Sequence, residues 1–325
     1  MNIESADVQR SPGEKMHDAP LEYDGVVASL RARELHDVQP LIAGLHGNLV
    51  FRAHHPDHGA VVAKVTRPSR ATWLTASQHW SRRLRVHGLQ CPQIYEVDPA
   101  VALPSGQHAA LLIEEFVPGC PPITTAHYYE IGAFLARLHQ LPTTNAPHHI
   151  AGGLAEVIDT WNATNDVPAA RALAPVIEAH LDSLARQPNV VAHCDLHVAN
   201  VATGPNGIYA LDLEMMQLAP AEFDIGRVLS NRSNLLFPAI ARPVLAGYVE
   251  HGGRTDLDIP ASITATLLRK MWLHSTHRNA DGTTVTIPGL YERLGRELTQ
   301  VESLTAETHV VIGSTRTRLL NRAQR

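Results

Sequence analysis

Residues 193–200 read HCDLHVAN and directly follow an apolar, strand-like run. Within them Asp195 and Asn200 lie five positions apart, and Asp212 lies in a second strand-like run, IYALDLE at 208–214. A carboxylate can orient and deprotonate an attacking hydroxyl, while a second carboxylate and an amide oxygen can hold Mg²⁺ on phosphates. Two strands joined by this loop would bring the three side chains to one corner. The pattern therefore predicts phosphoryl transfer.

The chain has only three lysines, and one of them, Lys64, ends the apolar stretch VVAK at residues 61–64. Because an unpartnered ammonium is costly to bury, a lysine in such a strand is expected to face negative charge, here the phosphates of a nucleotide. The preceding loop contains Gly44, Gly47 and Asn48. Glycine amides can approach phosphate oxygens because no Cβ intervenes. These residues predict a phosphate site in the N-terminal part of the chain.

The hydrophobic pattern divides the chain into a flexible tail at 1–24, a small β-rich lobe at 25–116 and a larger helical lobe at 117–325. Strands of the first lobe are expected at residues 48–55, 60–65, 93–97 and 109–116, and helices at 25–35 and 69–87. Helices of the second lobe are expected at residues 128–141, 154–163, 168–186, 238–250, 261–278 and 289–305, with strands at 189–192 and 207–213. This is an α+β, bilobal fold with a small antiparallel sheet.

Composition excludes several classes of protein. A formal net charge of -5 leaves no basic surplus for nucleic acid. The three cysteines form no CxxC pair or disulfide framework, which favours a reducing cytoplasm. The first twenty residues lack the apolar core of a signal peptide, and no apolar run approaches the length of a membrane span. We therefore expect a cytoplasmic protein without nucleic-acid or membrane partners.

Four segments carry a resemblance to a known family. They are VVAHCDLHVAN at 190–200, YALDLEMMQLAPAEFDIGRVL at 209–229, LLIEEFVPG at 111–119 and IGAFLARLHQLP at 131–142. They resemble the catalytic loop, the metal-binding segment, the interlobe hinge and the LxxLH helix of the aminoglycoside phosphotransferase and choline kinase group. That group shares the protein-kinase fold, and the order and spacing match from about residue 41 to residue 230.

The resemblance implies a role for each matching residue. Asp195 would be the catalytic base, Asn200 and Asp212 would be ligands of Mg²⁺, and Lys64 would bind the phosphates of ATP or GTP. The other implied residues would contact adenine through their backbone (Glu115, Phe116 and Val117) or support the catalytic loop and the metal (His193, Asp224 and Glu214). The acceptor would be a hydroxylated small molecule, and the protein a monomer or a homodimer.

Three positions depart from the family pattern. The helical Glu that pairs with the strand lysine has no equivalent, because no acid occurs between Asp57 and Glu96. Gln78 falls near that place, or Ser77, and Gln78 could hydrogen-bond Lys64 without neutralising it. Cys194 stands where the family has a small Gly, and Val198-Ala199 stands where Pro-Gly is common.

The sequence leaves the function open between three alternatives. The first is a small-molecule phosphotransferase that inactivates an antibiotic or natural product, or a metabolic kinase of the choline, homoserine or sugar type. The second is a nucleotide-binding module with little catalysis, which the missing helical acid favours. Protein phosphorylation is disfavoured because no activation segment between DFG and APE motifs is present. Residues 120–325 carry 19 acids against 16 bases, so no acidic lobe specifies a polycationic acceptor.

Overall fold

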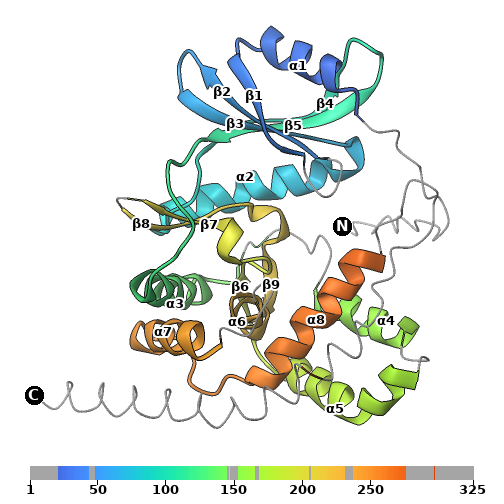
Figure 1. Cartoon of the computed structure of the whole chain (residues 1–325), viewed down its shortest axis with the longest axis vertical. Coiled ribbons are helices and arrows are strands. Elements are labelled where there is room, and N and C mark those ends of the chain that lie inside the picture. The colour runs from blue at the N-terminus through green and yellow to red at the C-terminus, as the bar shows by residue number, and fades with distance from the viewer. Residues whose placement is uncertain are drawn as a thin grey trace, which may run out of the picture.

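The computed structural model describes residues 21–43, 48–144, 146, 153–164, 168–204, 206–230, 237–275 and 296. They form two lobes, one above the other in Figure 1. The upper lobe contains a five-stranded antiparallel sheet and two helices, and the lower lobe is mainly helical with two short two-stranded sheets. The α+β, two-lobed arrangement predicted from the sequence is confirmed.

The upper lobe follows a simple chain order. Its elements are α1 (Tyr23–Ala32), β1 (His36–Ala43), β2 (Leu49–His55), β3 (Gly59–Thr66), the 3-10 turn η1 (Pro68–Arg70), α2 (Ala71–Val86), β4 (Ile94–Ala102) and β5 (His108–Glu115). The strand order in the sheet is β1-β2-β3-β5-β4, which puts β3 and Lys64 at the centre. A tight hairpin joins β2 to β3, and Gly59 supplies the left-handed backbone (φ 71°) that the turn needs.

The sheet has two differently covered faces. One face packs its apolar residues against α1, which contributes Val26 and Leu30 to a common core. The other face packs Leu112 and Ile94 against α2 through Leu74. In Figure 1, α1 lies above the sheet and α2 lies between the sheet and the lower lobe. Residues on the α2 face of the sheet therefore point toward the junction of the lobes.

The lower lobe holds six described helices. They are α3 (Thr125–His139), α4 (Leu154–Thr164), α5 (Pro168–Ala185), α6 (Glu222–Leu229), α7 (Phe237–Glu250) and α8 (Ile259–Ser275). Strand β6 (Asn189–Ala192) pairs with β9 (Gln217–Pro220), and β7 (Val201–Gly204) pairs with β8 (Gly207–Ala210). The 3-10 turns η2 (Val198–Asn200) and η3 (Leu213–Met215) lie beside these strands. The indole Nε1 of Trp80 on α2 donates to the carbonyl of Met216 at 2.9 Å, which ties α2 to this lobe.

Helices α3 and α7 cross at two glycines. A Cβ on Gly132 of α3 would lie 1.9 Å from the carbonyl oxygen of Val244, and one on Gly247 of α7 would lie 2.0 Å from that of Tyr129. Real side chains do not tolerate such distances, so the helices can approach this closely only because both positions lack a Cβ. This crossing positions the C-terminal end of α3, which carries His139.

Most of the expected elements are confirmed, and four were missed. The sequence did not predict β1, β7, β9 or α6. Strand β1 contains Pro40, which weakens a strand signal but is tolerated because β1 is an edge strand. The run expected as a strand at 207–213 ends at Ala210, because Asp212 adopts a left-handed conformation (φ 60°). Most of the expected tail at 1–24 and, apart from Arg296, the helix at 289–305 lie outside the described residues.

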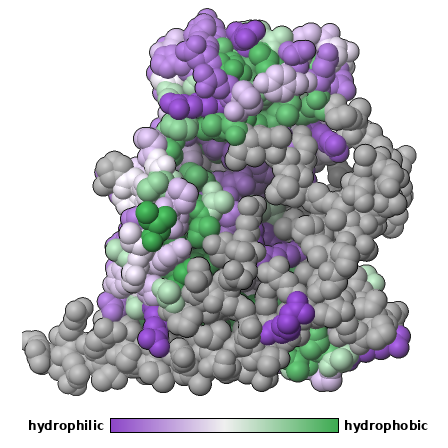
Figure 2. Space-filling model, viewed as in Figure 1, coloured by the Kyte–Doolittle hydropathy of each residue, from purple (hydrophilic) through white to green (hydrophobic). Residues whose placement is uncertain are grey.

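Within the described part of the chain, none of the helices has the length and apolar character required to cross a bilayer. The outer face of the upper lobe visible in Figure 2 is mostly hydrophilic, with a hydrophobic band along its lower border.

Replacing Gly132 by Ala is expected to lower the free energy of unfolding by about 3 kcal/mol, because the added methyl forces α3 away from α7. Gly25→Ala in α1 is the matched control. Its Cβ would meet the flexible Glu22 carboxylate at 3.2 Å and no nearby backbone, and alanine is the better helix former. Urea denaturation of both variants measures the effect, and equal stabilities would contradict the close crossing.

Candidate active site

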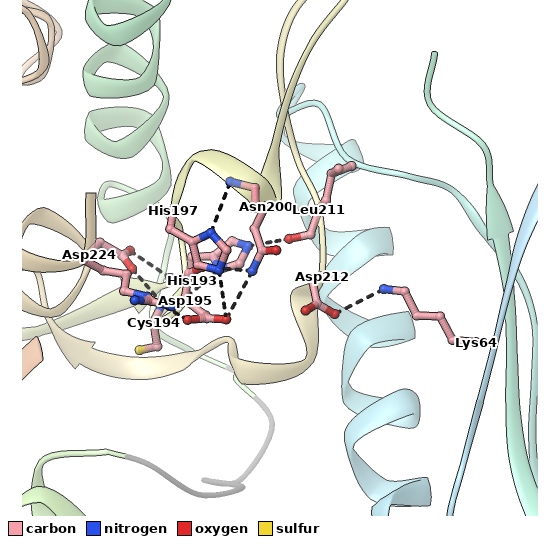
Figure 3. Close-up of polar contacts among 11 residues, drawn as sticks. Lys64, His193, Cys194, Asp195, His197, Asn200, Leu211, Asp212 and Asp224 are labelled. Carbon is pink, nitrogen blue, oxygen red and sulfur yellow. Dashed lines mark hydrogen bonds and ion pairs between the residues drawn. The ribbon is translucent and has the colours of Figure 1, made fainter. Parts of the chain in front are cut away.

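The catalytic-loop sequence forms a compact turn directly after β6. Asp195 lies in the loop, and η2 brings Asn200 back toward it. The amide Nδ2 of Asn200 donates to the Asp195 carbonyl oxygen at 3.0 Å and to its Oδ2 at 3.1 Å. Figure 3 shows Asp195 and Asn200 facing each other, with Asp212 nearby. Because the Asn200 amide nitrogen is used in this way, its amide oxygen is the group left for a cation.

Asp224 at the start of α6 holds the loop through its backbone. Its Oδ2 accepts the amide N–H of His193 at 2.8 Å and its Oδ1 accepts that of Cys194 at 2.6 Å. Nε2 of His139, at the end of α3, lies 3.1 Å from Oδ2. Burial alone would raise the pKa of Asp224, but the hydrogen bonds from His139 and from the loop outweigh it and hold the pKa below its ordinary value. Asp224 is therefore a buried carboxylate that fixes the loop in place.

Cys194 has a left-handed backbone, with φ 62°. This explains why a Gly is usual at this position in the family that the sequence resembles, since Gly adopts positive φ without cost. The side chain is fully buried, and burial raises the pKa of the thiol to about 12. Cys194 is thus a neutral packing residue and not a nucleophile.

His193 connects the loop to the segment that presents Asp212. Its Nδ1 accepts the amide N–H of Asp195 at 3.3 Å, so Nε2 donates to the carbonyl of Leu211 at 2.9 Å. The amide of Leu211 in turn donates to the carbonyl of Asn200 at 2.9 Å. These bonds hold Asp195, Asn200 and Asp212 in one rigid corner, as their spacing in the sequence predicted.

Lys64 reaches this corner from the other lobe. Its Nζ lies 3.2 Å from Oδ1 of Asp212 and 3.1 Å from Oε1 of Glu114 on β5 (Figure 3 shows the Asp212 contact). Burial by itself would lower the pKa of Lys64, but the carboxylates of Glu114 and Asp212 outweigh it and raise the pKa above its ordinary value. Lys64 is therefore a charged ammonium held between the lobes.

The partner of Lys64 differs from the one expected on α2. Gln78 lies half-buried on α2 and makes no hydrogen bond to Lys64 in the part of the chain that the structure describes, and Ser77 donates to the carbonyl of Trp73 instead. Glu114, which the sequence marked only as part of the hinge, supplies the missing acid. Strand pairing explains why, since Lys64 faces Leu112 and Glu114 is two residues further along the same face. An acid at the end of the buried run AALLIEE was the available signal.

Asp212 and Glu214 form a carboxyl pair beside Lys64. Burial and the charge of Asp212 raise the pKa of Glu214 to about 8, and the Glu214 carboxyl hydrogen-bonds Asp212. Crowded carboxylates next to an amide oxygen are the hard donors that Mg²⁺ prefers, so Asn200, Asp212 and Glu214 fit a divalent cation. The described residues contain no group of three or more His, Cys, Asp or Glu side chains arranged to hold a metal alone. Binding here would therefore draw on phosphate oxygens and water.

The residues expected to bind the nucleotide are only partly placed as predicted. Gly44 and Gly47 lie outside the described residues. The side chain of Asn48 accepts the Thr66 hydroxyl at 2.7 Å, so it ties the start of β2 to the end of β3. The amide N–H of Glu115 is bound to the carbonyl of Gln93 and that of Phe116 to the carbonyl of Ala60. Both N–H groups are thus occupied, and of the three expected residues only Val117 keeps an amide N–H without a partner among the described residues.

Arg227 on α6 was missed by the sequence analysis. Its Nε donates to Oδ1 of Asp195 at 2.8 Å, while Nε2 of His197 lies 3.9 Å from Oδ2. Arg227 lies three residues after Asp224, so one turn of α6 carries both the anchor of the loop and a cation against its carboxylate. The three-residue spacing was the only sequence signal for this contact, and it can be interpreted only once α6 is known to begin at Glu222.

Comparisons with known proteins identify the family of the chain. A family model described as "Phosphotransferase enzyme family" matches residues 38–261. No curated protein matches the chain.

Three solved structures illustrate the fold. The amicoumacin kinase hAmiN, solved with AMP-PNP, Ca²⁺ and Ami, is 17% identical with a TM-score of 0.61, and the match covers 87% of this chain and 94% of that one. The macrolide 2'-phosphotransferase MphH from Brachybacterium faecium is 17% identical with a TM-score of 0.56, covering 84% and 97%. The aminoglycoside phosphotransferase APH(3'')-Id from Streptomyces rimosus is 19% identical with a TM-score of 0.54, covering 77% and 97%. At these identities the likeness shows a shared protein-kinase-like fold.

Asp224→Asn is expected to destabilise the protein by about 3–5 kcal/mol at pH 7, because an amide cannot accept both loop N–H groups and the His139 ring as a carboxylate does. Because the folded-state pKa is lowered, the contribution of Asp224 is present above the ordinary pKa of 3.8 and is lost as the pH falls through the folded value. The difference between wild type and variant should therefore shrink below pH 3.8. Urea denaturation at pH 7 and pH 3 measures it.

Asp182→Asn, at an exposed position on α5, controls for the loss of one carboxylate. A stability of Asp224→Asn equal to that of this control would contradict the anchoring role.

Proposed function

We propose that this chain, which belongs to the phosphotransferase enzyme family, moves the γ-phosphoryl group of a nucleoside triphosphate to a hydroxyl of a small molecule. One observation carries the proposal: Lys64 of the upper lobe and Asp212 of the lower lobe meet at 3.2 Å, beside the loop that holds Asp195 and Asn200. A cation, oxygen ligands for a metal and a carboxylate base are the groups that phosphoryl transfer requires.

The upper lobe would hold the nucleotide. Lys64 would bind the α- and β-phosphates, with Glu114 keeping its ammonium charged and held at the junction of the lobes. The free amide N–H of Val117 and the carbonyl oxygens of the hinge would contact the nucleobase, whether adenine or guanine. Mg²⁺ bound by Asn200 and Asp212 would neutralise charge on the phosphates.

The lower lobe would activate the acceptor. The acceptor oxygen attacks the γ-phosphorus, the bond from that phosphorus to the bridging oxygen breaks, and Asp195 takes the hydroxyl proton. The products are a phosphomonoester and the nucleoside diphosphate. Asp224, His139 and His193 contribute by holding the Asp195 backbone, so that little reorganisation is needed during the reaction.

The acceptor is proposed to be a natural product of the antibiotic type. The support is that hAmiN, MphH and APH(3'')-Id, which share the fold, are kinases or phosphotransferases named for such compounds. A metabolic kinase of the choline, homoserine or sugar type is the alternative. We place the reaction in the cytoplasm, in keeping with three free cysteines. The Glu114–Lys64 pair removes the reason for expecting a nucleotide-binding module with little catalysis.

Asp195→Asn is expected to lower the rate of phosphoryl transfer by about 10²–10⁴-fold, because an amide cannot accept the hydroxyl proton. Nucleotide affinity should stay within a few fold, since Asp195 is not among the proposed phosphate or metal ligands. Asp159→Asn, exposed on α4, is the control for the same chemical change. The measurements are nucleoside diphosphate release with a hydroxylated acceptor and binding of a non-hydrolysable nucleotide. Full turnover by Asp195→Asn would refute the assignment of Asp195 as the base.

Glu114→Gln is expected to lower kcat/KM for the nucleotide by about 10–100-fold, which corresponds to the 1.5–3 kcal/mol of a hydrogen bond to a charged group. Lys64 would keep only Asp212, and it would lose its partner in the sheet. Glu130→Gln, exposed on α3, is the matched control. Steady-state kinetics with varied nucleotide and fixed acceptor test this prediction. Unchanged kinetics would contradict the role of Glu114 as the functional partner of Lys64.

A further inference from the structure

A basic hollow lies beside Asp195, between the catalytic loop, α6 and α8. The described residues that line it are Asp195, Phe223, Arg227, Thr266, Arg269 and Lys270. Three of these side chains are cationic and one is anionic. Around the carboxylate that is proposed to accept the hydroxyl proton, the lining is therefore positive.

Arg269 on α8 is the unusual member. The residue is only 5% exposed, and its Nε and Nη2 atoms are buried with no hydrogen-bond partner among the described residues. The neighbouring Cys194 offers no negative charge, because burial raises the pKa of its thiol to about 12. Buried guanidinium N–H groups without acceptors are unfavourable, and a bound anion would supply the acceptors that these two nitrogens lack.

The other two cations of the lining already contact oxygen atoms of the protein. Arg227 uses its Nε on Asp195, and Lys270 donates its Nζ to the carbonyl of Ser230 at 3.3 Å. The single carboxylate in the described lining, Asp195, is already bonded to Arg227.

We infer that this hollow binds an anionic group, a carboxylate or a phosphate, carried by the acceptor itself. The inference rests on the proposed function and names its substrate class: a hydroxylated molecule with an acidic group, not a polycationic amino sugar. Arg269 would form a charge-assisted pair with the acidic group, which would place a neighbouring hydroxyl of the same molecule at Asp195. Arg227 and Lys270 would share the remaining charge.

The γ-phosphate of the nucleotide is the other possible source of the same chemistry. The test therefore uses protein saturated with Mg²⁺ and a non-hydrolysable triphosphate analogue, which fills the γ-phosphate position. Inorganic phosphate is then added as the probe, against sodium chloride at equal ionic strength. We expect phosphate to raise the Tm of the wild-type complex by several degrees. No gain over chloride would overturn the inference.

Variants of Arg269 separate binding from structure. Arg269→Met should raise the Tm of the ligand-free protein, because it removes two buried N–H-bearing nitrogens that lack acceptors among the described residues, and it should abolish the gain from phosphate. Arg269→Lys should keep part of that gain. Arg137→Met, exposed on α3, should behave as wild type. A lowered Tm in Arg269→Met, with the phosphate gain retained, would assign Arg269 a structural role and refute the inference.

An acceptor screen gives an independent result. A panel of hydroxylated compounds, in matched acidic, neutral and amino-bearing forms, is scored by mass for the gain of one phosphoryl group. Acidic members should be preferred, and Arg269→Met should raise their KM at least tenfold while leaving the KM for nucleotide unchanged. Preference for amino-bearing members, or an effect on nucleotide KM alone, would overturn the inference. If no member reacts, the phosphate experiment decides.

Failure of this inference is distinguishable from failure of the proposed function. Binding of the triphosphate analogue with Mg²⁺, and its loss in Lys64→Met, tests the nucleotide site without any acceptor. If the analogue binds and phosphate gives no stabilisation, the inference is wrong while the nucleotide-dependent function stands. If the analogue does not bind, the proposed function fails.

Discussion

A buried ammonium needs negative charge, and this constraint organises the junction of the two lobes. Lys64 lies in the central strand with only 14% of its side chain exposed, and it takes one carboxylate from its own sheet and one from the lower lobe. Glu114 is itself a buried acid, so neither member of the pair is stable without the other. Asp212 completes the set from the lower lobe, and a nucleotide's phosphates would enter a position where charge is already balanced and oriented.

The side chains of the proposed site are positioned mostly by hydrogen bonds to the backbone. Asp224 accepts two consecutive loop amides, and His193 donates to a carbonyl of the segment that carries Asp212. Left-handed backbone at Cys194 and Asp212 turns the chain sharply at both ends of the site. Such conformations are unfavourable for non-glycine residues and persist only where the surroundings enforce them. At Cys194 the buried carboxylate of Asp224, hydrogen-bonded to His139, supplies that enforcement.

The acid that pairs with Lys64 lies on β5 and not on α2, and this placement changes what holds the upper lobe together. In this chain the lysine and its acid belong to paired strands, so their contact does not depend on where α2 lies. Helix α2 is instead attached to the lower lobe through the indole of Trp80. The cations near Asp195 come from α6 and α8. In the proposed function Lys64, balanced by its carboxylates, would serve the nucleotide, and these cations would serve the acceptor.

The sequence by itself determined the two-lobed fold, and it drew attention to Asp195, Asn200, Asp212 and Lys64 as the residues of the proposed site. Strand periodicity is local, and the catalytic-loop spacing lies within about twenty residues, so both are visible along the chain. Only the tertiary structure decided that Glu114 pairs with Lys64, that the N–H groups of Glu115 and Phe116 are occupied, and that Arg227 and Arg269 line one hollow with Asp195. These contacts join residues between 32 and 74 positions apart, or depend on which strands pair. Strand register and helix packing establish them, and a single sequence records neither.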